Sequence, residues 1–244
     1  MKKTEPKALR RVPKSPITHF LDVFLRLFYR RKVIGRDIID SSQASVFVCN
    51  HGFTSGPITA ALYFPVRFRV WINSTMLNCK EASASMEDSF RDNFKFLGRW
   101  GRKAFCRVAS WLVCHVLRSY HPIPVYKGNT RKTIETLSLS IDALNKGENL
   151  LIFPEKPDDD GYNDETFKEF NTGFATLGRA YYKNTGRRLK FYPVFSDAPT
   201  HTLIIGEPVT YDPENEPRSE KLRITSELQG RMTGLKDKLL TCSS

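Results

Sequence analysis

The chain has 244 residues, 40% of them hydrophobic, and a formal net charge of +12. This length suffices for one large domain with a buried core, or at most two small ones. The excess of Lys and Arg favours an anionic partner, such as a lipid surface, a phosphorylated substrate or nucleic acid. The five cysteines have neither Cys-x-x-Cys nor zinc-site spacing. We therefore expect free thiols, no metal site, and a reducing, cytoplasmic compartment.

The first predicted element is an amphipathic helix over residues 15–32, which Ser15 can cap and Pro16 can open. The apolar side chains at helical spacing are Phe20, Phe24, Leu27 and Phe28. Basic residues fill the second half, a pattern typical of a helix at a membrane interface. A helix that packs this stripe on the core of the domain is the alternative. The interrupting charged residues exclude a bilayer-spanning segment and speak against a cleaved signal peptide.

From residue 41 to residue 244 the pattern is that of one mixed α/β domain, which follows a basic N-terminal segment at residues 1–40. Strands are predicted at 44–49, 67–72, 123–126, 149–153, 189–195, 202–205 and 208–211. Helices are predicted at 57–63, 83–96, 102–118, 129–145, 172–183 and 219–240. The helix at 102–118 is a second candidate for the membrane interface or for covering the core. The alternation predicts an α/β fold with a mixed, largely parallel sheet flanked by helices.

A histidine stands at the end of the first strand of this domain, within FVCNHGFTSGPITAA at residues 47–61. The carboxyl ends of parallel strands are where α/β proteins place their binding and catalytic groups. A neutral imidazole at His51 can take a proton from a hydroxyl or an amine near neutral pH. A structural histidine that is hydrogen-bonded in a turn is the alternative.

Two further strands end at charged residues. The strand in LIFPEK, at 151–156, delivers Glu155 to its end, where the carboxylate can contact a substrate, hold loop amides or only cap the loop. The strand in IPVYKG, at 123–128, ends at Lys127, which can bind a phosphate or remain solvated. The apolar strand FYPVF, at 191–195, is predicted to lie in the core.

In order and spacing, the stretches NHGFTSG, IPVYKG, IFPEKPD and YPVF resemble the motifs of the PlsC-like glycerolipid acyltransferases. The resemblance runs from about residue 46 to residue 209 and includes FKEFNTGFATLGRA. It implies transfer of an acyl group from acyl-CoA or acyl carrier protein to a lysolipid or related acceptor, with no other cofactor. It also implies a peripheral position on the membrane, which explains the charge without nucleic acid, for which no motif is present.

The resemblance also assigns roles to individual residues. His51 is implied as the general base. Glu155, as a second catalytic residue, and nearby backbone amides are implied to shape the acceptor site and to help stabilise the oxyanion. The residues implied in substrate binding are Asn50, Lys127, Pro154 and Lys156.

The chain departs from the family pattern at two important positions. Gly56 stands where the family has an aspartate that orients the histidine, and Thr54, Ser55 or Glu155 are the candidates to replace it. Asp158 stands where the family has an arginine that helps to bind the phosphate of the acceptor. The acceptor therefore need not be a lysophosphatidate. The alternative function is a catalytically impaired relative that binds lipid or acyl chains.

Overall fold

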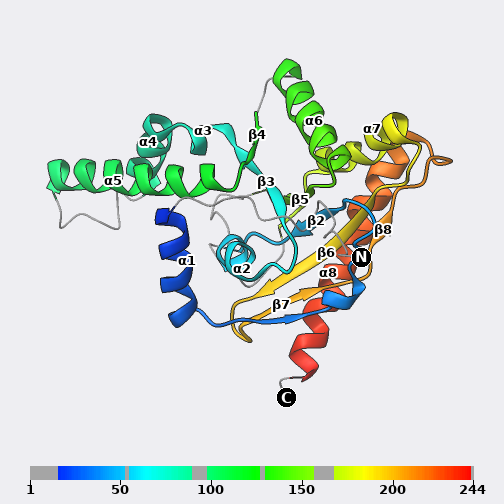
Figure 1. The fold of residues 1–244 in the computed structure, drawn as a ribbon, viewed down its shortest axis with the longest axis horizontal. Coiled ribbons are helices and arrows are strands. Elements are labelled where there is room, and N and C mark those ends of the chain that lie inside the picture. Colours follow the sequence, from blue (N-terminus) through cyan, green and yellow to red (C-terminus); the bar gives the residue numbers. More distant parts are fainter. Residues whose placement is uncertain (1–15, 53–54, 90–97, 127–129, 157–167, 243–244) are drawn as a thin grey trace, which may run out of the picture.

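The computed structural model describes residues 16–52, 55–89, 98–126, 130–156 and 168–242. A central sheet with helices on both faces dominates the fold (Figure 1). Its strands in the described residues are β1 (Lys32–Ile34), β2 (Val46–Cys49), β3 (Phe68–Asn73), β4 (Ile123–Val125), β5 (Asn149–Ile152), β6 (Lys190–Asp197), β7 (Thr202–Ile205) and β8 (Val209–Thr210). The helices are α1 (Pro16–Phe28), α2 (Ser55–Tyr63), α3 (Ser74–Leu77), α4 (Cys79–Ser89), α5 (Gly98–Ser119), α6 (Thr130–Asn145), α7 (Thr176–Thr185) and α8 (Pro217–Cys242), with short 3₁₀ helices at Arg36–Ile38 and Thr172–Ala175.

The strand order is β1-β7-β6-β2-β5-β3-β4, and β8 pairs with β6. The strands from β6 to β4 in this order run parallel to one another, whereas β7 and β8 are antiparallel to β6. The predicted mixed, largely parallel α/β sheet is therefore confirmed. Because β6, β2 and β5 are neighbours and parallel, their carboxyl ends meet at one edge of the sheet.

The central strands are buried on both faces, and alternate residues enter different cores. On one face, Val46 and Val48 pack with buried side chains of α6, α7 and α8. On the other face, Phe47 and Cys49 pack with Ala60 of α2. Such two-sided burial explains why these strands are continuous apolar runs rather than alternating ones.

The predicted N-terminal helix ends four residues earlier than expected, because the chain joins the sheet. The helix stops at Phe28, and Lys32–Ile34 pairs with β7 as strand β1. Gly35 then turns the chain with φ of 79°, and a Cβ on it would lie 2.2 Å from the carbonyl oxygen of Ile205. Part of the basic segment predicted as separate at residues 1–40 thus belongs to the sheet.

The helix predicted at 83–96 begins earlier than expected, as two helices. Asn73 and Asn78 each accept a hydrogen bond from a main-chain N–H two residues later, and they start α3 and α4. Asparagine at these positions is a helix-starting signal that the apolar spacing alone does not reveal. Residues 90–97 of the prediction lie outside the described part of the chain.

Helix α1 turns its polar side toward the domain. Thr18 donates to Ser119 Oγ at 2.9 Å, and Arg26 donates to the carbonyl of Leu62. On its apolar side, Phe20 is 68% exposed and Leu27 is 66% exposed. The alternative in which this stripe packs on the core is therefore wrong. No helix in the described residues is long and apolar enough to cross a bilayer.

Candidate active site

His51 and Glu155 lie close together at the carboxyl edge of the sheet. His51 follows β2 and Glu155 follows β5, and these two strands are adjacent and parallel. The ring of Phe153 meets the His51 ring edge to face, with the ring centroids 5.5 Å apart. The site therefore arises where two buried strands end side by side, as expected for a parallel α/β sheet.

Glu155 holds the main chain of the histidine loop. Its carboxylate accepts the N–H of His51 at 2.6 Å and the N–H of Lys168 at 3.4 Å, and it also accepts the N–H of Gly52. The side chain is only 7% exposed. Burial raises the pKa of the Glu155 carboxyl above its usual range, while the three N–H donors oppose the shift. These contacts make Glu155 the group that fixes where residue 51 leaves the strand.

The imidazole of His51 is oriented by a main-chain carbonyl. Nδ1 lies 2.9 Å from the carbonyl oxygen of Gly52. Because a carbonyl can only accept, Nδ1 must carry the proton in this contact, and the lone pair of the neutral ring is on Nε2. A histidine in this tautomer is prepared to act as a base through Nε2.

Asn50 fastens the histidine loop to the neighbouring strand β6. Its Oδ1 accepts the N–H of Ser196 at 2.8 Å, and its Nδ2 donates to the Ser196 carbonyl at 3.1 Å. The side chain is buried. Both polar atoms of this amide thus bond the main chain, and its contacts are those of a positioning residue.

Gly56 packs directly on the main chain that carries His51. An ideal Cβ at this position would lie 2.1 Å from the Asn50 carbonyl oxygen and 2.9 Å from the His51 carbonyl oxygen. The N–H of Gly56 donates to the His51 carbonyl at 3.3 Å. The position at which the resembling family carries its aspartate therefore has no room for a side chain in this backbone.

The remaining predicted site residues are distributed as follows. The Pro154 carbonyl accepts the N–H of Asn171 at 2.8 Å, and Lys156 pairs with Glu169 at 3.0 Å on the surface. Ser55 is buried in the first turn of α2. The structure does not describe Thr54, Lys127 or Asp158.

The sequence did not point to the Gly52 carbonyl or to Ser196 as parts of the site. Both contribute through main-chain atoms, which every residue type carries. No choice of side chain could therefore have indicated their roles.

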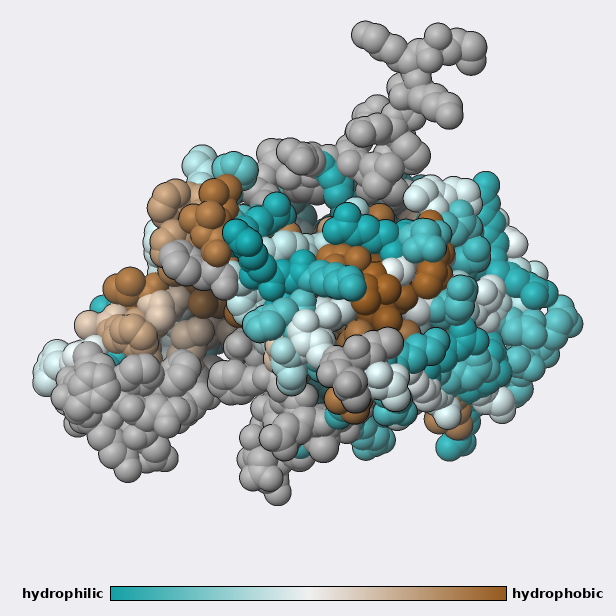
Figure 2. Space-filling view, turned by 90° about the horizontal axis from the view of Figure 1, so that it is seen from below, coloured by the Kyte–Doolittle hydropathy of each residue, from teal (hydrophilic) through white to brown (hydrophobic). Residues whose placement is uncertain are grey.

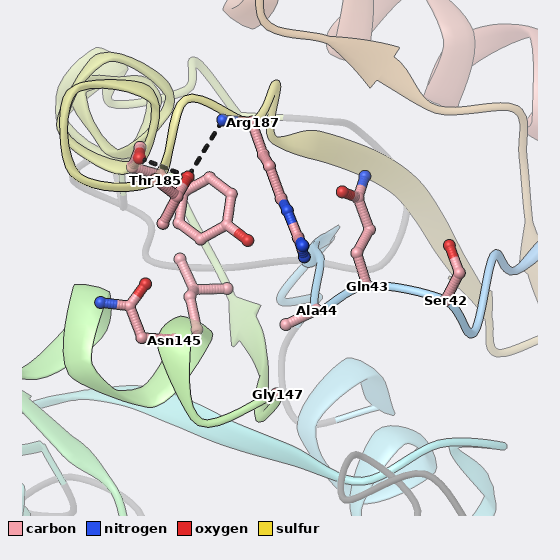
Figure 3. Close-up of a pocket in the computed structure, with 9 residues that line it drawn as sticks. Ser42, Gln43, Ala44, Asn145, Gly147, Thr185 and Arg187 are labelled. Atoms are coloured by element: carbon pink, nitrogen blue, oxygen red, sulfur yellow. Dashed lines mark hydrogen bonds between the residues drawn. The ribbon is translucent and has the colours of Figure 1, made fainter.

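A cavity of about 310 Å³ lies at the opposite edge of the sheet (Figure 3). Gln43, Gly147 and Arg187 line it, and they precede β2, β5 and β6. The cavity is therefore separate from the His51 site. In the parts of the chain that the structure describes, no cluster of His, Cys, Asp or Glu has the arrangement of a metal site.

Replacing Glu155 with glutamine should lower the free energy of unfolding by about 1–3 kcal/mol, the usual cost of an unsatisfied buried polar group. One carboxylate oxygen becomes an NH₂ group that faces a main-chain N–H donor. Chemical denaturation measures the effect. Lys156→Gln is the matched control and should change stability by less than about 1 kcal/mol, because its ion pair is exposed. Equal stability of the two variants would contradict the anchoring role of Glu155.

Comparison with known proteins supports the fold. No protein-family model and no curated protein matches the chain. Among solved structures, the chain is similar to the 1-acyl-sn-glycerophosphate acyltransferase PlsC of Thermotoga maritima, with 15% sequence identity and a TM-score of 0.51. The match covers 91% of this chain and 78% of that one. At this level of identity, the likeness shows an acyltransferase-like fold.

Proposed function

We propose that this protein transfers an acyl group from a thioester donor, acyl-CoA or acyl carrier protein, to the hydroxyl of a lysolipid. The observation that carries the proposal is the contact between His51 Nδ1 and the Gly52 carbonyl. It leaves a lone pair on Nε2 at the edge of the sheet where α/β proteins bind substrates. The likeness in fold to a lipid acyltransferase supports the same reaction class.

In the proposed mechanism, Nε2 of His51 accepts the proton of the acceptor hydroxyl as its oxygen attacks the thioester carbonyl. The tetrahedral intermediate then collapses, the carbon–sulfur bond breaks, and the imidazolium returns its proton to the departing thiolate. Glu155 acts on the reaction through the main chain, because it holds the N–H groups of His51 and Gly52. The same anchor keeps the Gly52 carbonyl beside the ring.

The neutral carbonyl of Gly52 replaces only part of what a carboxylate provides. In serine proteases, loss of the orienting aspartate costs about 10⁴-fold in rate, chiefly because the histidine adopts the wrong tautomer. The Gly52 carbonyl keeps the required tautomer. It stabilises the imidazolium less than a charged acceptor does, because hydrogen bonds to ionised groups are about twice as strong. We therefore expect an active enzyme with a modest turnover.

We also propose that α1 holds the protein on the membrane, where a lysolipid acceptor resides. The helix binds the domain through Thr18 and Arg26 and leaves Phe20, Val23 and Leu27 exposed. Apolar side chains on the outward face of a helix with basic residues are the pattern of an interfacial helix. The arrow of β6 ends on the side of the molecule that carries α1 (Figure 1), and His51 follows the parallel neighbouring strand β2 at the same edge. An acceptor in the bilayer surface would therefore be near the His51 edge.

The test is an acyl-transfer assay of the purified protein with acyl-CoA and acyl carrier protein donors and a panel of lysolipids that differ in headgroup. An acylated product that is missing with His51→Ala supports the proposal. Binding of lipid without any product, unaffected by His51→Ala, would instead support the second candidate function, a lipid-binding protein without turnover. The observation that favours this second candidate is Gly56, which has no side chain where the acyltransferase family has the aspartate that orients the histidine.

A further inference from the structure

Helix α5 has one face that packs within the protein and one that does not. Cys106, Ser110 and Cys114 are buried. Ser110 Oγ donates to the sulfur of Met86 at 3.2 Å, and the Cys114 thiol donates to the Met76 carbonyl at 3.2 Å. This face is thus covered by α3 and α4, with which α5 forms the helical segment between β3 and β4.

A second face of α5, beside the buried one, carries large apolar side chains that are exposed over about three helical turns. Trp100 is 88% exposed, Val108 67% and Trp111 54%. Their spacing of eight and three residues places them on one side of the helix. Tryptophan is the residue that favours the boundary between lipid tails and headgroups, because its ring is apolar and its N–H is polar.

The charges on α5 identify the kind of surface that would cover this face. The 22 residues of α5 contain no Asp or Glu. Lys103 and Arg107 are exposed and lie one turn apart, next to the side that carries Trp100 and Trp111. A second copy of the same basic helix would be repelled, whereas an anionic lipid surface attracts each basic residue close to it.

The position of α5 relative to α1 supports the same partner. Thr18 of α1 bonds Ser119 at the end of α5, and Tyr120 donates to Asp22 of α1 at 3.4 Å. Figure 2 shows hydrophobic surface, in brown, at the end of the molecule where Figure 1 places α1 and α5, and a further patch near the middle of that face. Two interfacial elements that bind the same bilayer reinforce each other, because binding of the first makes that of the second intramolecular.

We propose that the outward face of α5, carrying Trp100, Val108 and Trp111, inserts into an anionic lipid bilayer as a second docking element beside α1. Choosing the membrane as the partner rests on the proposed function, but docking through α5 does not require acyl transfer to occur. The two docking elements would bring the protein to the bilayer with the carboxyl edge of the sheet on the same side.

Tryptophan fluorescence can test the insertion directly, because the chain contains three tryptophans. Trp71 donates to Ser140 within the domain, so Trp71→Phe removes the signal that does not report on α5. In this background, vesicles of phosphatidylglycerol and phosphatidylcholine should shift the emission to shorter wavelength. Lipids with brominated acyl chains should quench it. No shift and no quenching would overturn the proposal. A shift caused by raising the protein concentration without lipid would also overturn it, in favour of a second copy.

Vesicle binding of surface variants gives an independent test. The pair Trp100→Ser and Trp111→Ser should weaken binding to phosphatidylglycerol vesicles about tenfold or more, because two large apolar side chains are lost from the interface. Leu222→Ser is the matched control, since Leu222 is 55% exposed on α8. Its binding should equal that of the wild type. Equal binding by the double variant, or equal binding of the wild type to neutral vesicles, would overturn the proposal.

Activity in detergent keeps this inference separate from the proposed function. With a lysolipid dispersed in detergent, the double variant should be as active as the wild type, since α5 lies outside the His51 site. Vesicle binding that depends on α5 in a protein without transfer activity would contradict only the proposed function. If the protein has transfer activity but the double variant binds vesicles as well as the wild type does, only the docking of α5 would be contradicted.

Discussion

Replacing His51 with alanine is expected to lower kcat/KM for acyl transfer by about 10²- to 10⁴-fold, the usual contribution of a positioned general base. The substitution removes Nε2 but keeps the main-chain N–H of residue 51, which Glu155 accepts. The loop should therefore keep its conformation, and the loss should come from the missing proton acceptor. Steady-state kinetics with a thioester donor measures the loss. Thermal unfolding of both proteins checks that the fold is intact.

His201→Asn is the matched control for the His51 experiment. His201 is exposed, lies in the turn between β6 and β7, and has φ of 53°, which asparagine tolerates better than alanine does. This variant should keep the wild-type rate. Full activity of His51→Ala beside an active wild type would place the base elsewhere. The contact between His51 Nδ1 and the Gly52 carbonyl would then no longer support the proposed function.

The two strands that carry the site could be predicted because their residues leave little choice of structure. The runs before His51 and before Glu155 are short, apolar and bounded by polar or turn-forming residues, as buried parallel strands are. Parallel strands place their ends at the same edge, which allows two distant residues to be assigned to one site. The direct pairing of β2 with β5 depends on the strand order of the whole sheet, and no local sequence pattern predicts that order.

The orientation of α1 and the partner of the imidazole could not be predicted, for different reasons. An amphipathic pattern shows that a helix has an apolar face, but not whether that face turns inward or outward. Here, the hydrogen bonds of Thr18 and Arg26 to distant residues decide the matter. The resemblance to the acyltransferase family suggested that a side chain replaces the aspartate at the ring. The Nδ1 proton instead meets the main-chain carbonyl of Gly52.

Introducing the aspartate of the resembling family, by Gly56→Asp, should reduce activity rather than increase it. The Cβ of any residue at this position would meet the carbonyl oxygens of Asn50 and His51 at 2.1 and 2.9 Å. Main-chain atoms cannot move aside as a flexible side chain can. We therefore expect the free energy of unfolding to fall by about 3 kcal/mol, the upper part of the usual range for overpacking. Denaturation curves and acyl-transfer rates of the purified variant measure both effects.

Two alanine variants separate the cost of the Cβ from the effect of the carboxylate. Gly56→Ala should be nearly as unstable as Gly56→Asp, because the two share the Cβ. Gly230→Ala on α8, where the added Cβ meets nothing within 4 Å beyond the adjacent residues and the backbone of its own helix, should be neutral or more stable by up to about 1 kcal/mol. If Gly56→Asp instead raised the rate while Gly56→Ala lowered it, a carboxylate would fit beside the ring. The expected result means that the His51 loop packs where that carboxylate would stand, and that the contact of Nδ1 with the Gly52 carbonyl serves in its place to orient the imidazole.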